Sequence, residues 1–250
     1  MISFARPTIS KQDLKHVLEA MLSDRLENGD LSRKLAKELG EFVGSQNLLV
    51  FNSKEMGLFL ILQQLGLSPG DEVVIPAYGD PFILEVLTFL KLTPRFVDLK
   101  EGTYGMDLEK AGAAIGEKTK VLIVSHLFGY PVDIPASLVE REGLVVIEDA
   151  THALGCRHGE KHPGLQGNFG LFSLDSESLI TTAQGGFVTC RHRKDFEALR
   201  DKRSMKNPER MEGRLGVSLS DLQSALGLSE LSLAPKFLAR RSEIGKYYRE

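Results

Sequence analysis

Short apolar runs alternate with longer amphipathic segments along the first 150 residues of the chain. The runs are rich in valine, isoleucine and leucine, a composition typical of strands that are buried on both faces of a parallel sheet. The segments between them repeat apolar residues at helical spacing. Strands are predicted at 48–51, 72–75, 95–98, 120–125 and 144–149, and helices at 10–24, 32–42, 56–65, 82–90, 108–115 and 134–141.

The alternation changes after residue 155. Two further strands are predicted at 169–174 and 186–190 with only a polar segment between them, and helices follow at 195–205, 221–231 and 235–248. Regular alternation of strands and helices is the pattern of an α/β fold. The sequence therefore predicts a three-layer α/β/α architecture with a mostly parallel sheet of about seven strands, formed by a single large domain over residues 1–250.

The stretch 144–155 carries the first candidate site residue. Its apolar run leads directly into Glu148 and Asp149, followed by small residues. Ligands of open α/β sheets bind beyond the carboxyl ends of the strands. An unpaired buried carboxylate is costly, so Asp149 is expected either to face a ligand or to cap a neighbouring backbone group.

Composition narrows the class of protein. With 250 residues, 42% hydrophobic and 26% charged residues and a net charge of −3, the chain is typical of a globular domain and has no basic stripe for nucleic acid. We expect no signal peptide and no membrane span. The two cysteines, Cys156 and Cys190, lack metal-binding spacing and favour a reduced, cytoplasmic setting. His158 and His162 are four apart, but Gly159 and Pro163 indicate a loop, so no metal site is expected.

A set of short motifs, in order along the chain, resembles the large domain of the pyridoxal-phosphate-dependent sugar aminotransferases, the DegT/DnrJ/EryC1/StrS family of fold type I. The motifs are Phe4-x-Arg-Pro7, Gly66-x-x-Pro-Gly-Asp-Glu-Val73, Thr93-Pro-x-Phe-Val-Asp98, His126-Leu-Phe-Gly-Tyr-Pro131, Val146-Ile-Glu-Asp-Ala150, His152-Ala-Leu-Gly155, Phe169-Gly-x-Phe-Ser173, Gln184-Gly-Gly186 and Leu222-Gln-x-Ala-Leu-Gly227. The resemblance implies one antiparallel strand in the sheet, a homodimer, a nucleotide-sugar ligand and pyridoxal 5'-phosphate (PLP) as cofactor. It also implies that the family's smaller C-terminal domain is absent or truncated here.

The resemblance assigns roles to three positions. Asp149 matches the aspartate that pairs with the pyridine nitrogen of the cofactor. This pairing keeps the nitrogen protonated, so that the ring can act as an electron sink. His152 matches a position beside the ring, and Ser173 matches a serine that reaches the phosphate. Without the resemblance, His152 would be interpreted as an ordinary pocket histidine.

The essential residue is absent. The position of the family's Schiff-base lysine is Ser178, whose hydroxyl forms no imine and is a poor base. The phosphate-binding Ser-Gly-Thr turn is Ser53-Lys54-Glu55, where Glu55 would repel phosphate and Lys54 would partly compensate. Asp80 occupies the position of the aromatic residue that stacks on the cofactor ring in the family, and Tyr78 lies two residues earlier. Gly216 occupies the position of the family's phosphate-binding asparagine.

Other polar residues have simpler interpretations. Asp175, Glu177 and Ser178 form either an acid–hydroxyl group or a solvated loop. The basic residues Lys202, Arg203, Lys206 and Arg210, and the pair Arg240 and Arg241, are expected on a solvated surface or a subunit rim.

Three functions are compatible with this pattern. The first is a degenerate homologue that lacks transaminase activity and binds a nucleotide sugar or a partner subunit. Such a protein would bind PLP weakly or not at all. The second is an active PLP-dependent sugar aminotransferase or dehydratase with an atypical site. The third is a structural interaction protein that keeps only the fold.

Overall fold

The computed structural model describes residues 5–23, 26–157, 159, 162–203 and 215–249. Its helices are α1 (Lys11–Met21), α2 (Asp30–Val43), α3 (Lys54–Gln64), α4 (Phe82–Phe89), α5 (Leu108–Ala114), α6 (Ala136–Val139), α7 (Arg193–Arg203) and α8 (Asp221–Tyr247), with a 3₁₀ turn η1 (Leu127–Gly129). Its strands are β1 (Leu48–Phe51), β2 (Glu72–Pro76), β3 (Thr93–Val97), β4 (Thr119–Ser125), β5 (Val145–Asp149), β6 (Phe169–Ser173) and β7 (Gly186–Cys190).

The seven strands form one sheet in the order β1-β7-β6-β5-β4-β2-β3. Strand β7 pairs antiparallel with both β1 and β6, whereas the other neighbouring pairs are parallel. The predicted α/β class, the mostly parallel seven-stranded sheet and its single antiparallel strand are therefore confirmed.

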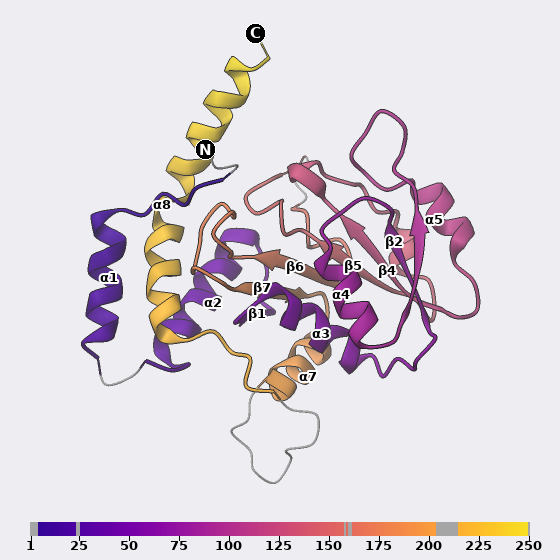
Figure 1. The fold of residues 1–250 in the computed structure, drawn as a ribbon, viewed down its shortest axis with the longest axis horizontal. Helices are drawn as coiled ribbons and strands as arrows, with labels where there is room; N and C mark the ends of the chain where they lie inside the picture. Colours follow the sequence, from indigo (N-terminus) through magenta and orange to yellow (C-terminus); the bar gives the residue numbers. More distant parts are fainter. Residues whose placement is uncertain (1–4, 24–25, 158, 160–161, 204–214, 250) are drawn as a thin grey trace.

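Helices cover both faces of the sheet (Figure 1). On β4, Val121 and Ile123 contact one layer, which contains α3, α4 and α7, while Leu122 and Val124 contact the opposite layer, which contains α5 and α6. Helices α2 and α8 pack on that second face at the β1 and β7 end. Buried apolar side chains on alternating strand positions thus produce the three layers.

Three predicted helices differ from the structure. The segment 134–141 contains only the single-turn helix α6, which begins after Pro135. The separate helices predicted at 221–231 and 235–248 are wrong, because α8 runs unbroken through Pro235. The predicted ends at Asp24 and Met205 lie outside the described residues.

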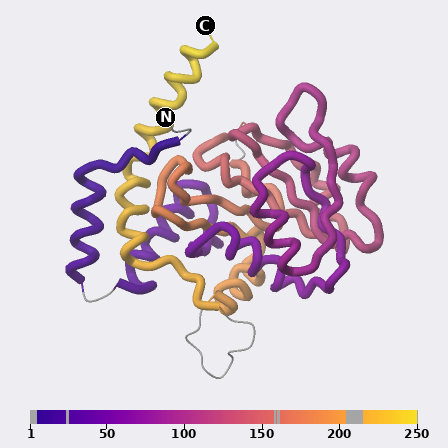
Figure 2. Tube along the Cα trace, viewed as in Figure 1, coloured from indigo at the N-terminus to yellow at the C-terminus, as the bar shows by residue number. Residues whose placement is uncertain are grey.

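Helix α8 packs against the two N-terminal helices and extends beyond the sheet. Its first half packs against α1 and α2, and its second half projects beyond the sheet (Figure 1). The N-terminal segment crosses beside α8 before α1 begins (Figure 2). No helix in the described part of the chain is both long and apolar enough to cross a bilayer.

Candidate functional site

The candidate site lies at the carboxyl ends of the central strands. Asp149 ends β5 and is in register with Ser125 at the end of β4 and with Leu171 on β6. Ser173 ends β6 two residues later. This is the edge at which α/β sheets place their ligands, so topology brings Asp149 and Ser173 to one place although 24 positions separate them in sequence.

Asp149 is buried and uses one carboxylate oxygen locally. Its Oδ1 accepts hydrogen bonds from the Thr151 hydroxyl at 2.6 Å and the Thr151 backbone N–H at 3.1 Å. Among the described residues, none donates a hydrogen bond to its Oδ2. Asp149 therefore caps the Thr151 backbone N–H, which is one of its two predicted roles. Its second carboxylate oxygen, Oδ2, is left for another group.

A cleft of about 400 Å³ lies beside this edge. It is lined by the β5–β6 and β6–β7 connections, by the start of α3, and by single residues of the N-terminal segment, the β2–α4 connection, η1 and α8. The lining residues are Ala5, Lys54, Asp80, Phe128, Thr151, His152, Leu154, Ser173, Asp175, Ser176, Glu177, Ser178, Leu179 and Arg241. Its volume is within the range of small-molecule sites. The structure thus brings together Lys54, His152, Ser173 and Ser178, four of the residues that the sequence singles out.

An ion triad lies in the cleft. The Lys54 ammonium is 3.0 Å from Asp80 Oδ2 and 3.2 Å from Asp175 Oδ2, and it lies 5.0 Å from the centre of the Phe82 ring. Burial opposes the charged form of Lys54, but the hydrogen bonds and charges of Asp80 and Asp175 outweigh burial and raise its pKa above the ordinary value. Lys54 is therefore held as a cation.

The start of α3 fixes the position of Lys54. Ser53 caps the helix by accepting the Met56 N–H through its hydroxyl at 3.2 Å. Gly186 on β7 lies against the backbone of Lys54, since a Cβ at Gly186 would come within 2.8 Å of the Lys54 Cα. Close packing of α3 on β7 thus directs the lysine side chain into the cleft.

Ser178 faces the same strand end. Its hydroxyl donates to the Ser173 hydroxyl at 3.0 Å, and the Asp175 N–H donates to the same Ser173 oxygen at 3.1 Å. Ser178 and Ser173 are therefore in direct contact at the positions that the resemblance assigns to the Schiff-base lysine and to a phosphate ligand.

Aromatic side chains form the outer wall. His152 is exposed and stacks on Phe128, with ring centroids 5.9 Å apart and an interplanar angle of 17°. Phe128 has a φ of 55°, an uncommon conformation for a bulky residue, and Tyr104 packs edge-on against it at 5.3 Å. His152 thus lies at the cleft, where its ring stacks on the ring of Phe128.

Sequence reasoning missed several cleft residues. Asp175 was expected in an acid–hydroxyl group or a solvated loop, and Arg241 on a solvated surface or a subunit rim, yet both line the cleft. Gly216 and Tyr78 are exposed and do not line it. Lys202 and Arg203 end α7, and Arg203 is half-buried, with a guanidinium N–H donated to Val50 O at 2.6 Å. Lys206, Arg210 and His158 lie outside the described residues. Within the described part, no group of histidine, cysteine and acidic side chains is arranged to hold a metal.

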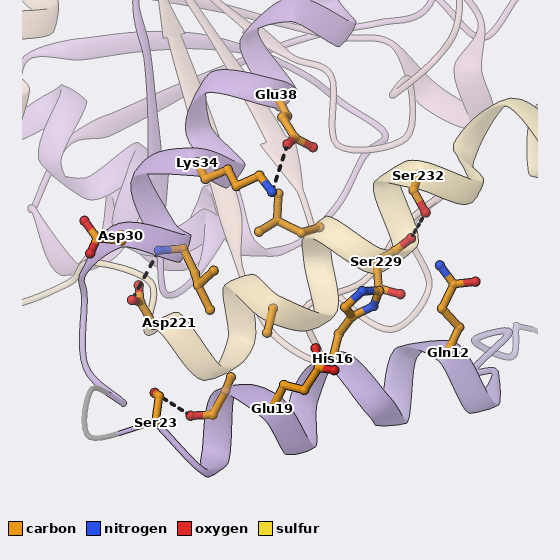
Figure 3. Close-up of a pocket in the computed structure, with 14 residues that line it drawn as sticks. Gln12, His16, Glu19, Ser23, Asp30, Lys34, Glu38, Asp221, Ser229 and Ser232 are labelled. Carbon is orange, nitrogen blue, oxygen red and sulfur yellow. Dashed lines mark hydrogen bonds and ion pairs between the residues drawn. The ribbon is translucent and has the colours of Figure 1, made fainter.

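A larger cavity, about 810 Å³, lies between α1, α2 and α8 (Figure 3). Its floor includes Asp221, whose carboxylate accepts backbone N–H groups at the start of α2 at 2.8–3.2 Å. Its other charged side chains pair with near neighbours, as Lys34 does with Glu38 at 3.8 Å. None of the described residues that line it was singled out in the sequence as a candidate site residue, so the smaller cleft at the strand ends is the better candidate site.

Comparison with known proteins gives the family of the chain. The sequence profile of the DegT/DnrJ/EryC1/StrS aminotransferase family matches residues 7–250. The UDP-4-amino-4-deoxy-L-arabinose–oxoglutarate aminotransferase of Shewanella sediminis is 29% identical, and the match covers 100% of this chain and 68% of that protein.

Two solved structures are also similar. The aminotransferase TlmJ of Streptoalloteichus hindustanus superposes with a TM-score of 0.93 at 26% identity, over 99% of this chain and 70% of TlmJ. The PLP-form of Spr1654 of Streptococcus pneumoniae superposes with a TM-score of 0.88 at 25% identity, over 99% and 70% of the two chains. This chain belongs to the DegT/DnrJ/EryC1/StrS aminotransferase family.

Proposed function

We propose that this chain is a degenerate member of its family, which lacks transaminase activity and uses the cleft at the strand ends to bind a sugar ligand. The observation that carries the proposal is the triad of Lys54, Asp80 and Asp175. Lys54 and Asp80 both depart from the family pattern, and they depart together as charge partners. Paired changes of this kind support a site that has been adapted from transamination to ligand binding.

The residues present do not fit PLP as a covalently held cofactor. Ser178 offers a hydroxyl where an amine is required. Lys54 does not replace that amine, because an imine forms from a neutral amine and the triad raises the Lys54 pKa. Asp149, Ser53 and Ser173 remain as contacts for ring and phosphate, but Asp80 brings a carboxylate to the place of the stacking ring. We therefore propose weak or absent PLP binding.

The proposed ligand class is a nucleotide sugar. Its support is the relative from Shewanella sediminis, whose name specifies a UDP-linked amino sugar, together with a cleft of suitable volume lined by hydroxyl, acidic and basic side chains. A cytoplasmic location is proposed on the two thiols, which are both free.

A homodimer is the proposed assembly. Helix α1 exposes an apolar stripe of Leu14, Leu18, Met21 and Leu22, with exposures of 57%, 48%, 55% and 87%. Exposed contiguous apolar surface on a folded domain marks an interaction site. Sedimentation velocity at micromolar concentration checks this proposal, and a monomer under these conditions would contradict it.

The proposed loss of transaminase activity is tested by titrating the purified chain with PLP and reducing with borohydride. Wild type is expected to show neither visible imine absorption nor a trapped adduct, and no amino-group transfer from glutamate. A triple variant, Lys54→Gly with Asp80→Phe and Ser178→Lys, is expected to give a trapped adduct at position 178. The matched control, Lys54→Gly with Asp80→Phe and an unchanged Ser178, lacks only the new amine and is expected to give none.

The active-enzyme alternative is favoured by one observation, the retention of Asp149 and Ser173 at the same sheet edge. Under that alternative, wild type forms a trapped adduct or transfers an amino group in the same assay. Either result in wild type would refute the degenerate function.

A further inference from the structure

A small basic cavity of about 140 Å³ adjoins the cleft. It is enclosed by the N-terminal segment, the β6–β7 loop and the second half of α8, and three arginines line it: Arg6, Arg240 and Arg241. The N-terminal segment passes beside α8 (Figure 2). The N-terminal segment and α8, which are distant in sequence, thus place guanidinium groups around one space.

We infer that this cavity binds the phosphate group of a phosphorylated sugar, whose sugar part extends into the cleft beside Ser178. The inference rests on the proposed function, since it names the ligand chemistry of the same cleft. A sugar monophosphate and a nucleotide sugar share this chemistry, and the experiment below distinguishes them.

The size and position of the cavity favour a group rather than a whole ligand. At 140 Å³ it is well below the roughly 300–1,000 Å³ of complete small-molecule sites. It shares Ser176, Ser178, Leu179 and Arg241 with the 400 Å³ cleft. One ligand therefore reaches both spaces, with its anionic group at the arginines and its neutral part at the strand ends.

The charges favour an anion. Arg6 and Arg241 form no ion pair with any residue in the described ranges, and Arg240 uses one N–H for Glu243 at 2.6 Å. Each guanidinium carries five N–H donors and binds phosphate in a bidentate manner. Ser176, whose hydroxyl bonds to no described residue, adds a further donor at the boundary with the cleft.

Glu230 is the acidic group that lines the cavity. It is 2% exposed, and its Oε1 has no hydrogen-bond partner within the described residues. Burial, and next the charge of Asp13 on α1, raise the Glu230 pKa to about 7, against a hydrogen bond from the Thr181 backbone.

Other charged groups lie around Glu230. They are Asp13 on α1, Arg6 on the N-terminal segment, and Arg240 and Arg241 on α8. A bound anion disfavours the carboxylate form of Glu230, so binding is expected to take up a proton and to weaken as the pH rises through about 7.

Calorimetric titration of the full chain with glucose 1-phosphate, UDP-glucose, inorganic phosphate and glucose tests the inference. Phosphate-bearing ligands are expected to bind and glucose is not. In Arg6→Ala/Arg241→Ala their affinity should fall by at least about tenfold, whereas Lys236→Ala, an exposed position on α8 outside the cavity, should leave it unchanged. Tighter binding of UDP-glucose assigns a nucleotide sugar, and tighter binding of glucose 1-phosphate assigns a sugar monophosphate.

The inference is overturned if none of the phosphate-bearing ligands binds, if glucose binds equally well, or if the double arginine variant binds with wild-type affinity. Both arginines are exposed, so folding of the variant is expected and is checked by its melting temperature. A trapped PLP adduct in wild type would refute the proposed function separately, because that adduct is measured at a lysine and requires no arginine.

A second measurement isolates Glu230. Sulfate keeps its charge between about pH 6 and pH 8.5, so a change in its affinity reports on the protein. Wild-type affinity is expected to fall across this range, and Glu230→Gln is expected to lose most of that dependence. An equal fall in both proteins would remove Glu230 from the site.

Discussion

At the scale of single residues, Glu148 is a buried carboxylate that is held by several hydrogen bonds. It precedes Asp149, faces away from the cleft and is fully buried. Its Oε1 accepts the Gln166 and Gly167 N–H groups, both at 2.6 Å, and its Oε2 accepts the Gly164 N–H at 2.8 Å and lies 2.9 Å from His126 Nε2. Burial opposes ionisation, but His126 and these N–H groups outweigh burial and lower the Glu148 pKa.

Replacing Glu148 by Gln is expected to destabilise the fold strongly. The carboxamide nitrogen would face N–H donors, so at least one buried group loses its partner. The expected loss is about 3 kcal/mol, a fall in melting temperature of roughly 6–12 °C for a chain of this size. Glu142→Gln, on an exposed turn before β5, is the control. Equal melting temperatures for the two variants would contradict the assigned role of Glu148.

Single residues also mark the limit of what the sequence predicts. Asp149, Ser173 and Ser178 were placed at one site because motif order and strand ends fix them. Asp175 was not paired with Lys54, because 121 positions separate them and only the packing of α3 on β7 brings their side chains together. Arg241 was assigned to a solvated surface or a subunit rim because nothing local indicates that α8 passes the cleft.

At the scale of elements, apolar pattern predicted the strands well. Buried strands of a parallel sheet are continuous apolar runs, and each predicted run is a strand of the sheet. Helix ends were predicted less well. The pattern placed the start of α3 at 56, although Ser53 caps a helix that begins at Lys54. Proline was overinterpreted at 235, where tertiary packing of α8 overrides a local helix-breaking signal.

Pro235 gives a direct test of that explanation. It lies inside α8, is exposed, and supplies no N–H to the preceding turn. Pro235→Ala is expected to stabilise the chain by about 1–3 kcal/mol, which urea unfolding measures. Ala239→Pro, one turn further along, is expected to lower stability by about 3 kcal/mol. A loss of stability in Pro235→Ala would show that the proline shapes the packing of α8.

At the scale of the whole molecule, the packing of the peripheral helix α1 on α8 includes a buried pair of carboxyl groups. Asp13 is fully buried, and the buried Glu230 feels its charge. Asp13 Oδ2 accepts hydrogen bonds from the Ser10 hydroxyl and N–H at 2.6 and 2.7 Å. Burial opposes the charged form of Asp13, but hydrogen bonds from Ser10 and from Ser229 on α8 outweigh burial and lower its pKa. Two carboxyl groups therefore meet where α1 attaches to the rest of the fold.

This contact predicts a pH dependence of stability. The folded-state pKa of Glu230, about 7, lies above the unfolded value of about 4.3, so the folded chain binds more protons between these values. Stability from this group is complete below about pH 4 and is lost as the pH rises towards about 7. Glu230→Gln removes the ionisation, so its stability relative to wild type should increase over that window by an amount on the order of 3 kcal/mol.

Urea unfolding of both proteins at intervals from about pH 4.5 to pH 8.5, without added anion, measures this difference. Comparing the two proteins cancels the titration of other groups, including His162, whose pKa burial lowers. Protection of the α1 amides from hydrogen exchange should fall in wild type above about pH 7 and stay constant in Glu230→Gln, since α1 is the element that the carboxyl pair strains. A constant difference in stability across the pH range would mean that Glu230 is ionised in the folded chain throughout, with an arginine of the basic cavity as its partner.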